Sequence, residues 1–436
     1  MKFKKIFLSF LICSTLALSS CGNNNAETTT ETDQNENNPV SSENSNETTV
    51  ENEEVPTENE TEIETATETK EETKTTEEPI DEKEVASSQG VIVGVASIMP
   101  EPISLNPNEI HTRTYEYETL EEDAVQYSRQ IFALDTIITL VIYSSDNNGE
   151  DLLDIAEETI FGYETALSKT IEGSFTYELN KNKSYDLTNH PYRDNIIYLL
   201  NKSLYYNELS NGYFDITIEP LVNIWNFGED NQGEIPSDDD INEALSKIDS
   251  SNIVIDGYNV SLLNGATIDF GGIAKGYIAD KTSEALRLNG CASGIINLGG
   301  NVLTVGVKPT GTLWKVGIKN PDETVTGHDD IITAGAKSIV TSGIYERKFE
   351  KDGKTYHHIL DYTTGYPSES DVLYSNIICD YSIDGDALAT ILVLLGSEEG
   401  INLINSLDNV DAMIVTKDGN SFFSTDYVEK YNFIDK

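Results

Sequence analysis

The chain has 436 residues, and its 28 lysines and arginines stand against 76 aspartates and glutamates, a net charge of −48. A chain this acidic excludes nucleic acid and an anionic membrane surface as electrostatic partners. Its length allows two or three domains.

The first 21 residues have the pattern of an export signal. Lys2, Lys4 and Lys5 precede an apolar run that is too short to span a membrane, and Cys21 follows small residues, as in the lipobox of bacterial lipoproteins. We predict that Cys21 becomes the lipid-bearing N-terminus of an exported protein anchored to the bacterial cell membrane. The alternative is an ordinary secretory peptide with an incidental cysteine.

Residues 22–89 are rich in Glu, Thr, Asn and Ser and have few large apolar side chains. Such a segment buries too little surface to offset its ordering entropy, and its 21 acidic residues against 3 basic ones repel one another. We predict a disordered acidic linker here, a transition segment over 90–126, and one folded domain over 127–436.

Regular elements follow within that domain. The residue patterns predict strands at 136–143, 266–270, 316–318, 338–340 and 376–378, helices at 151–168, 191–209, 271–290 and 386–395, and a hairpin of 411–416 with 421–424 across Asp418-Gly419. Helices and strands are mixed along the chain without a regular βαβ alternation. This order favours a single large α+β domain. Of the cysteines in this domain, Cys291 and Cys379 either pair or remain buried free thiols.

A glycine turn between a strand and a helix is the first chemical motif, at Gly271–Tyr277. Glycines let the backbone approach an anion, the new helix offers free N–H groups, and Lys275 adds positive charge. The motif predicts a phosphate site, although glycine turns often serve only as tight connections.

The second motif is Asp384–Thr390. Asp386 and Thr390 are four residues apart and would share one face of a helix, where a carboxylate and a hydroxyl could both bind a hard cation such as Mg²⁺. The alternative is that Asp384 or Asp386 only caps that helix.

The third motif is Tyr356–Pro367, which contains the adjacent pair His357 and His358. Neighbouring side chains on a strand point to opposite faces, so only one of the two imidazoles can face a given site. That imidazole would be a general base or a phosphate contact.

With these motifs in view, the chain resembles the FAD:protein FMN transferases of the ApbE type, which are exported bacterial lipoproteins. The resemblance runs from about Gln130 to Ser424 through these ordered segments: Phe132–Thr136, Ser174–Asn180, Gly212–Thr217, Pro220–Gly228, Asp269–Asp280, Asn297–Asn301, Thr341–Gly343, the His-His-Ile run and Asp386–Thr390. It implies an ApbE-like (T-fold-like) domain.

The resemblance also implies site residues. Mg²⁺ would be held by Asp386, Thr390 and the backbone carbonyl of Gly272. FAD would be contacted by Asp269 and Lys275, in a pocket lined by Leu134, Tyr213, Phe214, Asp215 and Ile359. His358, together with Lys275, is the candidate catalytic group.

Two positions depart from the family pattern. Leu134 stands where methionine is usual, a change that conserves volume. Tyr362 stands where proline is usual, which leaves the geometry of that turn open.

The implied reaction transfers FMN from FAD to a threonine or serine hydroxyl of an exported or membrane-bound flavoprotein and releases AMP. Two alternatives remain: a Mg²⁺-dependent FAD pyrophosphatase that yields FMN and AMP, and a non-catalytic flavin-binding lipoprotein. The segment Asn264–Thr267 faintly resembles a flavin-acceptor motif and is interpreted as structural.

Overall fold

The computed structural model describes residues 105–113, 120, 124–228, 233–319, 321 and 328–435. The expected leader with Cys21, the acidic linker and much of the transition segment lie outside these ranges. The described residues all belong to one compact unit, Glu78–Lys436. No helix in these ranges is long and apolar enough to cross a bilayer.

An eight-stranded antiparallel sheet forms the centre of this unit. Its strands, in spatial order, are β1 (Val125–Ala133), β2 (Thr136–Ser144), β6 (Ser293–Leu298), β7 (Asn301–Val305), β10 (Ser338–Gly343), β15 (Val372–Cys379), β16 (Val410–Thr416) and β17 (Ser421–Phe423). Burial alternates along β2, where Ile138, Leu140 and Ile142 are buried and the residues between them are not. One face of the sheet therefore carries the main core.

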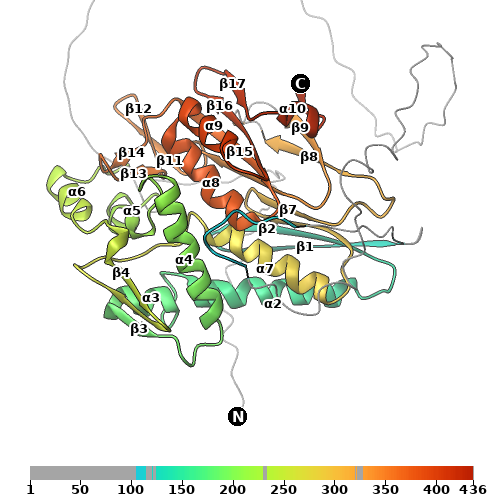
Figure 1. Ribbon diagram of the computed structural model, residues 1–436, viewed down its shortest axis with the longest axis horizontal. Coiled ribbons are helices and arrows are strands. Elements are labelled where there is room, and N and C mark those ends of the chain that lie inside the picture. Colours follow the sequence, from blue (N-terminus) through green and yellow to red (C-terminus); the bar gives the residue numbers. More distant parts are fainter. Residues whose placement is uncertain are drawn as a thin grey trace, which may run out of the picture. The chain divides into compact units, whose positions relative to one another are not determined.

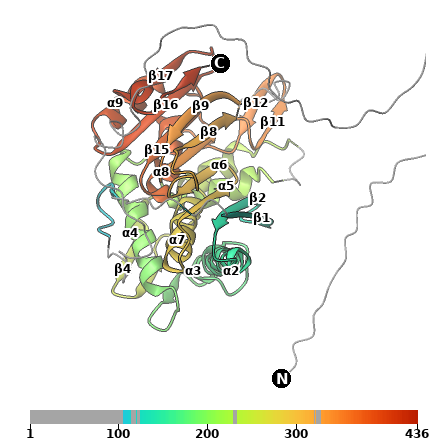
Figure 2. The same cartoon turned by 90° about the vertical axis from the view of Figure 1, so that its right-hand side faces the viewer.

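Helices cover that face. Figure 1 shows α2 (Gly149–Leu167), α7 (Ala274–Leu288) and α8 (Ser382–Leu395) side by side, and α9 (Ser397–Asn405) packs on β16. Turned by 90°, Figure 2 shows β1 and β2 beside α2. The amphipathic pattern of α2 explains its position, because its apolar residues recur on the side that meets the sheet.

A smaller layer lies on the opposite face. The strands β8 (Trp314–Lys319), β9 (His328–Ala334) and β18 (Ile434–Asp435), with α10 (Tyr427–Lys430), enclose a second core. In that core Ile332 meets Ile339, Ile378 and Met413 of the central sheet.

The remaining elements frame one end of the sheet. They are α3 (Phe175–Asn182), β3 (Ser184–Asp186), α4 (Arg193–Leu209), the 3-10 turns η2 (Ile216–Ile218) and η3 (Ser250–Asn252), α5 (Glu219–Trp225), α6 (Asp238–Leu245), β4 (Ile253–Asp256), β5 (Asn259–Leu262), and the short strands β11 (Lys348–Lys351), β12 (Lys354–His357), β13 (Leu360–Asp361) and β14 (Tyr366–Pro367).

This architecture confirms the α+β prediction and most of the expected elements. The strands expected at 136–143, 316–318, 338–340 and 376–378, the helix at 151–168 and the hairpin at 411–424 are all present. Cys291 and Cys379 are both buried free thiols.

The strand expected at 266–270 is wrong, because this segment joins no sheet. The carboxamide of Asn180 takes the place of a neighbouring strand: it accepts from the Ile268 N–H at 2.7 Å and donates to the Ile268 carbonyl at 2.8 Å. The segment has the apolar pattern of a strand, but the hydrogen-bonding groups of the Ile268 backbone are satisfied by a side chain and not by a neighbouring strand.

Two helix starts also differ from the prediction. α4 begins at Arg193 rather than at Pro191, and α8 begins at Ser382 rather than at Asp386. Asp386 therefore lies in the second turn of α8. The residue before α8, Tyr381, makes no side-chain cap.

Residues 105–113 of the transition segment pack onto the folded unit. The backbone N–H of His111 donates to Asp384, that of Arg113 donates to Asp380, and Lys202 donates to the Glu109 carbonyl. The folded unit thus includes chain N-terminal to Tyr127.

Candidate functional site

A cavity of about 1310 Å³ lies where the glycine turn, α8 and the β12–β13 connection meet. Every residue that the sequence assigned to the metal, to FAD or to catalysis lines it: Leu134, Tyr213, Phe214, Asp215, Asp269, Gly272, Lys275, His358, Ile359, Asp386 and Thr390. These residues come from segments up to about 250 residues apart, and the tertiary fold brings them to one cavity.

The glycine turn is held by its own aspartate. Asp269 accepts from the Gly271 N–H at 2.8 Å, and Lys275 in the first turn of α7 donates to the Gly271 carbonyl at 3.3 Å. A side chain at Gly272 would put its Cβ 3.1 Å from the Phe214 ring and 3.9 Å from the Thr390 hydroxyl. Gly272 therefore lies close to Phe214 and to Thr390 of α8.

The α7 and α8 helices exchange aspartates across their contact. Asp386 of α8 accepts from the Gly276 N–H of α7 at 2.9 Å, while Asp280 of α7 accepts from the Ser382 and Ile383 N–H groups of α8 at 2.9 and 2.8 Å. Asp386 therefore does act as a cap, but it caps the first turn of α7 and not the start of its own helix, α8. One Asp386 oxygen is fixed by this bond, and the other lies 3.9 Å from Lys275 Nζ.

Asp384 has a separate structural role. It is fully buried and pairs with Lys202 at 2.8 Å, which is also fully buried, and it accepts from the Tyr206 hydroxyl at 2.6 Å. With the His111 N–H as a third donor, this carboxylate anchors the start of α8 to α4 and to the N-terminal segment.

The residues proposed for a metal supply oxygen donors. Asp386 gives a carboxylate and Thr390, one turn later, gives a hydroxyl. Gly272, whose Cβ would lie 3.9 Å from that hydroxyl, would add a backbone carbonyl. Hard oxygen donors of this number suit Mg²⁺, which keeps several positions for water and phosphate. Within the described ranges no group of three or more His, Cys, Asp or Glu side chains is placed to hold a metal ion.

The adjacent histidines point in different directions. His358 lines the cavity, and its Nδ1 is buried without a hydrogen-bond partner. His357 instead places its Nε2 3.0 Å from the Ser368 carbonyl. Burial, with the charges of Arg347 and Lys275, lowers the pKa of His358 to about 3.

The turn between β1 and β2 presents Leu134 to the cavity. Leu134 and Asp135 both have positive φ, 55° and 56°, and neither is a glycine. Such a backbone costs on the order of 1 kcal/mol or more per residue. It is held partly by a hydrogen bond of 2.7 Å from the Leu134 N–H to Glu164 of α2.

Two of the expected FAD contacts already have protein partners. Asp215 accepts from the Thr217 N–H and hydroxyl and from the Ser250 N–H, which fixes the turn that carries Phe214. Asp269 lies 3.0 Å from Lys169 Nζ.

Sequence reasoning missed two cations of the cavity wall, Lys169 and Arg347. Lys169 also lies 3.7 Å from Glu219 and donates to Asn223. Neither residue belongs to a motif with recognisable spacing, so only the fold reveals them. Together with Lys275 they place three cations among the carboxylates that line this cavity.

The turn at Tyr362, where proline was expected, is closed by hydrogen bonds to Asp361. Asp361 accepts from the Thr363 N–H and hydroxyl, and its carbonyl accepts from the Gly365 N–H at 2.8 Å. The Tyr362 ring meets Tyr213 edge to face, with centroids 6.2 Å apart.

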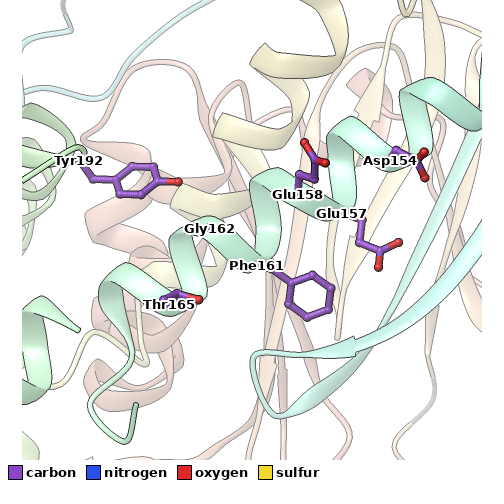
Figure 3. A pocket seen from close by; sticks show the side chains of 7 residues that line it. All are labelled: Asp154, Glu157, Glu158, Phe161, Gly162, Thr165 and Tyr192. Atoms are coloured by element: carbon purple, nitrogen blue, oxygen red, sulfur yellow. The ribbon is translucent and has the colours of Figure 1, made fainter. Parts of the chain in front are cut away.

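A second cavity, of about 610 Å³, lies on the outer side of α2 (Figure 3). Its wall carries the carboxylates of Asp154, Glu157 and Glu158, and Arg129 pairs with two of them. The residues that line this cavity include no lysine or arginine to meet a diphosphate, whereas Lys169, Lys275 and Arg347 line the larger cavity.

Comparisons with known proteins agree with this geometry. The ApbE family matches residues 134–414. A protein of Treponema pallidum named FAD:protein FMN transferase is 34% identical over 54% of this chain and 70% of its own length, and one of Klebsiella pneumoniae with the same name is 36% identical over 49% of this chain and 66% of its own.

Solved structures show the same fold. The crystal structure of the ApbE protein from Thermotoga maritima aligns with a TM-score of 0.64 at 30% identity and covers 70% of this chain and 99% of its own. The apo flavinyl transferase ApbE of Pseudomonas stutzeri aligns with a TM-score of 0.62 at 26% identity and covers 71% and 97%. With a family match over most of the folded domain and a cavity that gathers the motif residues, this chain belongs to the ApbE family.

Proposed function

We propose that this chain is a Mg²⁺-dependent FAD:protein FMN transferase, which moves FMN from FAD to a threonine or serine hydroxyl of a partner flavoprotein and releases AMP. Family membership supports the transferase activity, because relatives up to 36% identical carry that name. The observation that carries the proposal is the convergence of the glycine turn, Asp386 with Thr390, and His358 on one cavity.

The cavity residues would have two separate roles, metal binding and contact with the diphosphate. Asp386, Thr390 and the Gly272 carbonyl would hold the metal, and Lys275 would lie beside the diphosphate. A bound Mg²⁺ would supply positive charge to the diphosphate oxygens. Most of the acceleration would then come from positioning and electrostatic stabilisation, as in other phosphoryl transfers.

The acceptor hydroxyl oxygen would attack the phosphorus on the FMN side of FAD. A new P–O bond to the acceptor forms, the P–O bond that joins this phosphorus to AMP breaks, and AMP leaves with the bridging oxygen. His358 would take the hydroxyl proton. It is neutral at pH 7, and an incoming diphosphate beside Lys275 and Arg347 would raise its proton affinity by offsetting their charge.

An assay of FAD, Mg²⁺ and a flavin-free acceptor domain, followed by intact mass measurement, tests the proposal. An acceptor mass gain of one FMN, with equimolar AMP, is the expected result. Free FMN and AMP without an adduct would indicate the pyrophosphatase instead, and no turnover would indicate a flavin-binding protein.

We also propose that the protein works outside the cytoplasm, anchored through a lipid on Cys21, and that its acceptors are exported or membrane-bound. The export pattern of the first 21 residues supports this. Cys21→Ala should move the protein from the membrane fraction to the soluble fraction. Membrane retention of this variant would refute the anchor.

A further inference from the structure

The outer face of the β1–β2 hairpin is uncharged and leads into the cavity. Six residues define this face, which we call the hairpin platform: Ser128, Gln130, Phe132, Ile137, Thr139 and Val141. None of them is charged, although about a quarter of all residues in the chain are. On the opposite side of the same two strands, the buried residues meet α2.

Two large apolar side chains stand at the end of the platform nearest the cavity. Phe132 is 70% exposed and Ile137 is 63% exposed, and they are direct cross-strand partners. Both lie next to the turn whose residues Leu134, Asp135 and Thr136 line the cavity. Apolar groups exposed together at the mouth of a site are typical of a binding surface.

The platform is continuous with the cavity wall across the sheet. Gln130, Thr139, Asn297, Val302 and Ile339 are successive cross-strand partners, so their side chains share one face. Asn297, Val302 and Ile339 line the cavity, while Gln130 is exposed. A macromolecule that reaches into the cavity along this face has to cross the platform.

We propose that the hairpin platform is the docking surface for the acceptor protein, and that Phe132 and Ile137 bind apolar side chains that flank its hydroxyl residue. The inference rests on the proposed function, which requires a protein substrate to bring a hydroxyl to the cavity. A surface without carboxylates lets that substrate approach an enzyme that would otherwise repel acidic partners. Residues at the centre of such a contact carry most of the binding free energy.

The double variant Phe132→Gln/Ile137→Thr tests the docking surface. The new residues match the neighbouring Gln130 and Thr139 and leave the buried face unchanged. The probe is a soluble, flavin-free domain of a flavoprotein that carries FMN on a threonine, used as wild type and with that threonine changed to alanine.

FAD affinity should stay within about twofold, because neither changed residue lines the cavity. Affinity for the alanine form of the probe should fall about tenfold or more, the scale expected for two apolar anchors, and the KM for transfer to the threonine form should rise in parallel. The matched control is Val254→Thr/Leu288→Gln, whose side chains are 41% and 53% exposed on other elements; it should behave as wild type.

Wild-type affinity of the double variant for the alanine probe would overturn the proposal, and so would an equal loss in the control. Binding of this probe needs no chemistry. A wild-type protein that binds it but does not transfer FMN would therefore refute the proposed function alone, and the docking surface would still be judged on the variant's affinity.

Discussion

At the scale of single residues, the site depends on carboxylates that differ in their surroundings. One Asp386 oxygen accepts from the Gly276 N–H, and the other lies near Lys275. Asp384, two residues earlier, pairs with Lys202 and accepts from the Tyr206 hydroxyl and the His111 N–H. Of these two aspartates, only Asp386 lines the cavity. The same residue type is therefore buried in a structural contact at one position and lines the cavity at the other.

Asp386→Asn should reduce Mg²⁺-dependent turnover by on the order of 10²-fold, because an amide cannot supply the ligand charge. The fold should persist, since the amide oxygen can still accept from the Gly276 N–H. The measurement is FAD turnover against Mg²⁺ concentration, with Asp418→Asn in the exposed β16–β17 turn as a control. Unchanged Mg²⁺ dependence would show that the metal lies elsewhere.

His358→Ala should bind FAD almost normally and transfer FMN slowly, by about 10²- to 10⁴-fold, because it removes the proton acceptor and leaves Lys275 and Asp386 in place. Flavin fluorescence gives the affinity and mass measurement gives the rate. His357→Ala is the control, because its ring contacts the Ser368 carbonyl instead. Normal transfer by the His358 variant together with slow transfer by the His357 variant would reverse the assignment.

His358 should also make the fold sensitive to acid. Its pKa is about 3 in the folded chain against about 6.5 when unfolded, so below pH 6.5 the unfolded state binds the extra proton and stability falls as pH falls. At pH 5 this costs about 2 kcal/mol. His358→Gln should therefore lose less stability than wild type between pH 7 and 5 in urea unfolding; an equal loss in both proteins would contradict the lowered pKa.

At the scale of elements, the start of α8 decides where Asp386 and Thr390 lie. Three contacts fix it: Asp280 accepts from its first N–H groups, Asp384 pairs with Lys202 of α4, and Gly276 lets α7 approach. A Cβ at Gly276 would come within 2.1 Å of the Ser382 carbonyl oxygen. The distance between the glycine turn and the Asp386 carboxylate is thus set by helix packing.

Lys202→Met should destabilise the fold by about 3–5 kcal/mol, because it leaves the fully buried carboxylate of Asp384 without its cation. Denaturant unfolding measures the loss. Adding Asp384→Asn should restore part of it, since the amide carries no charge. A single variant with wild-type stability would mean that the Asp384 charge is compensated by other groups.

At the scale of the whole molecule, the folded unit carries the chemistry, and we expect residues 22–89 to provide reach. Deleting them should leave transfer to a soluble acceptor unchanged and should lower transfer to a membrane-anchored acceptor, because a tether sets the effective concentration of the two partners. Parallel assays with the two acceptor forms measure this. A large loss with the soluble acceptor would refute the linker interpretation.

The sequence alone determined the local part of this description. Hydrophobic periodicity predicted α2, β2 and the β16–β17 hairpin, because those signals depend on neighbours along the chain. The motif segments indicated the ApbE family, which the family match over residues 134–414 confirms. Every FAD-binding, metal-binding or catalytic residue that was assigned from that resemblance lines one cavity.

Only the tertiary structure decided the rest, because it depends on contacts between distant residues. Asn180 replaces a strand beside Ile268, so an apolar extended run stays outside the sheet. Asp386 serves the neighbouring helix, and His358 rather than His357 faces the cavity. Lys169, Arg347 and the uncharged hairpin platform follow no sequence pattern, since their importance comes from what the fold places beside them.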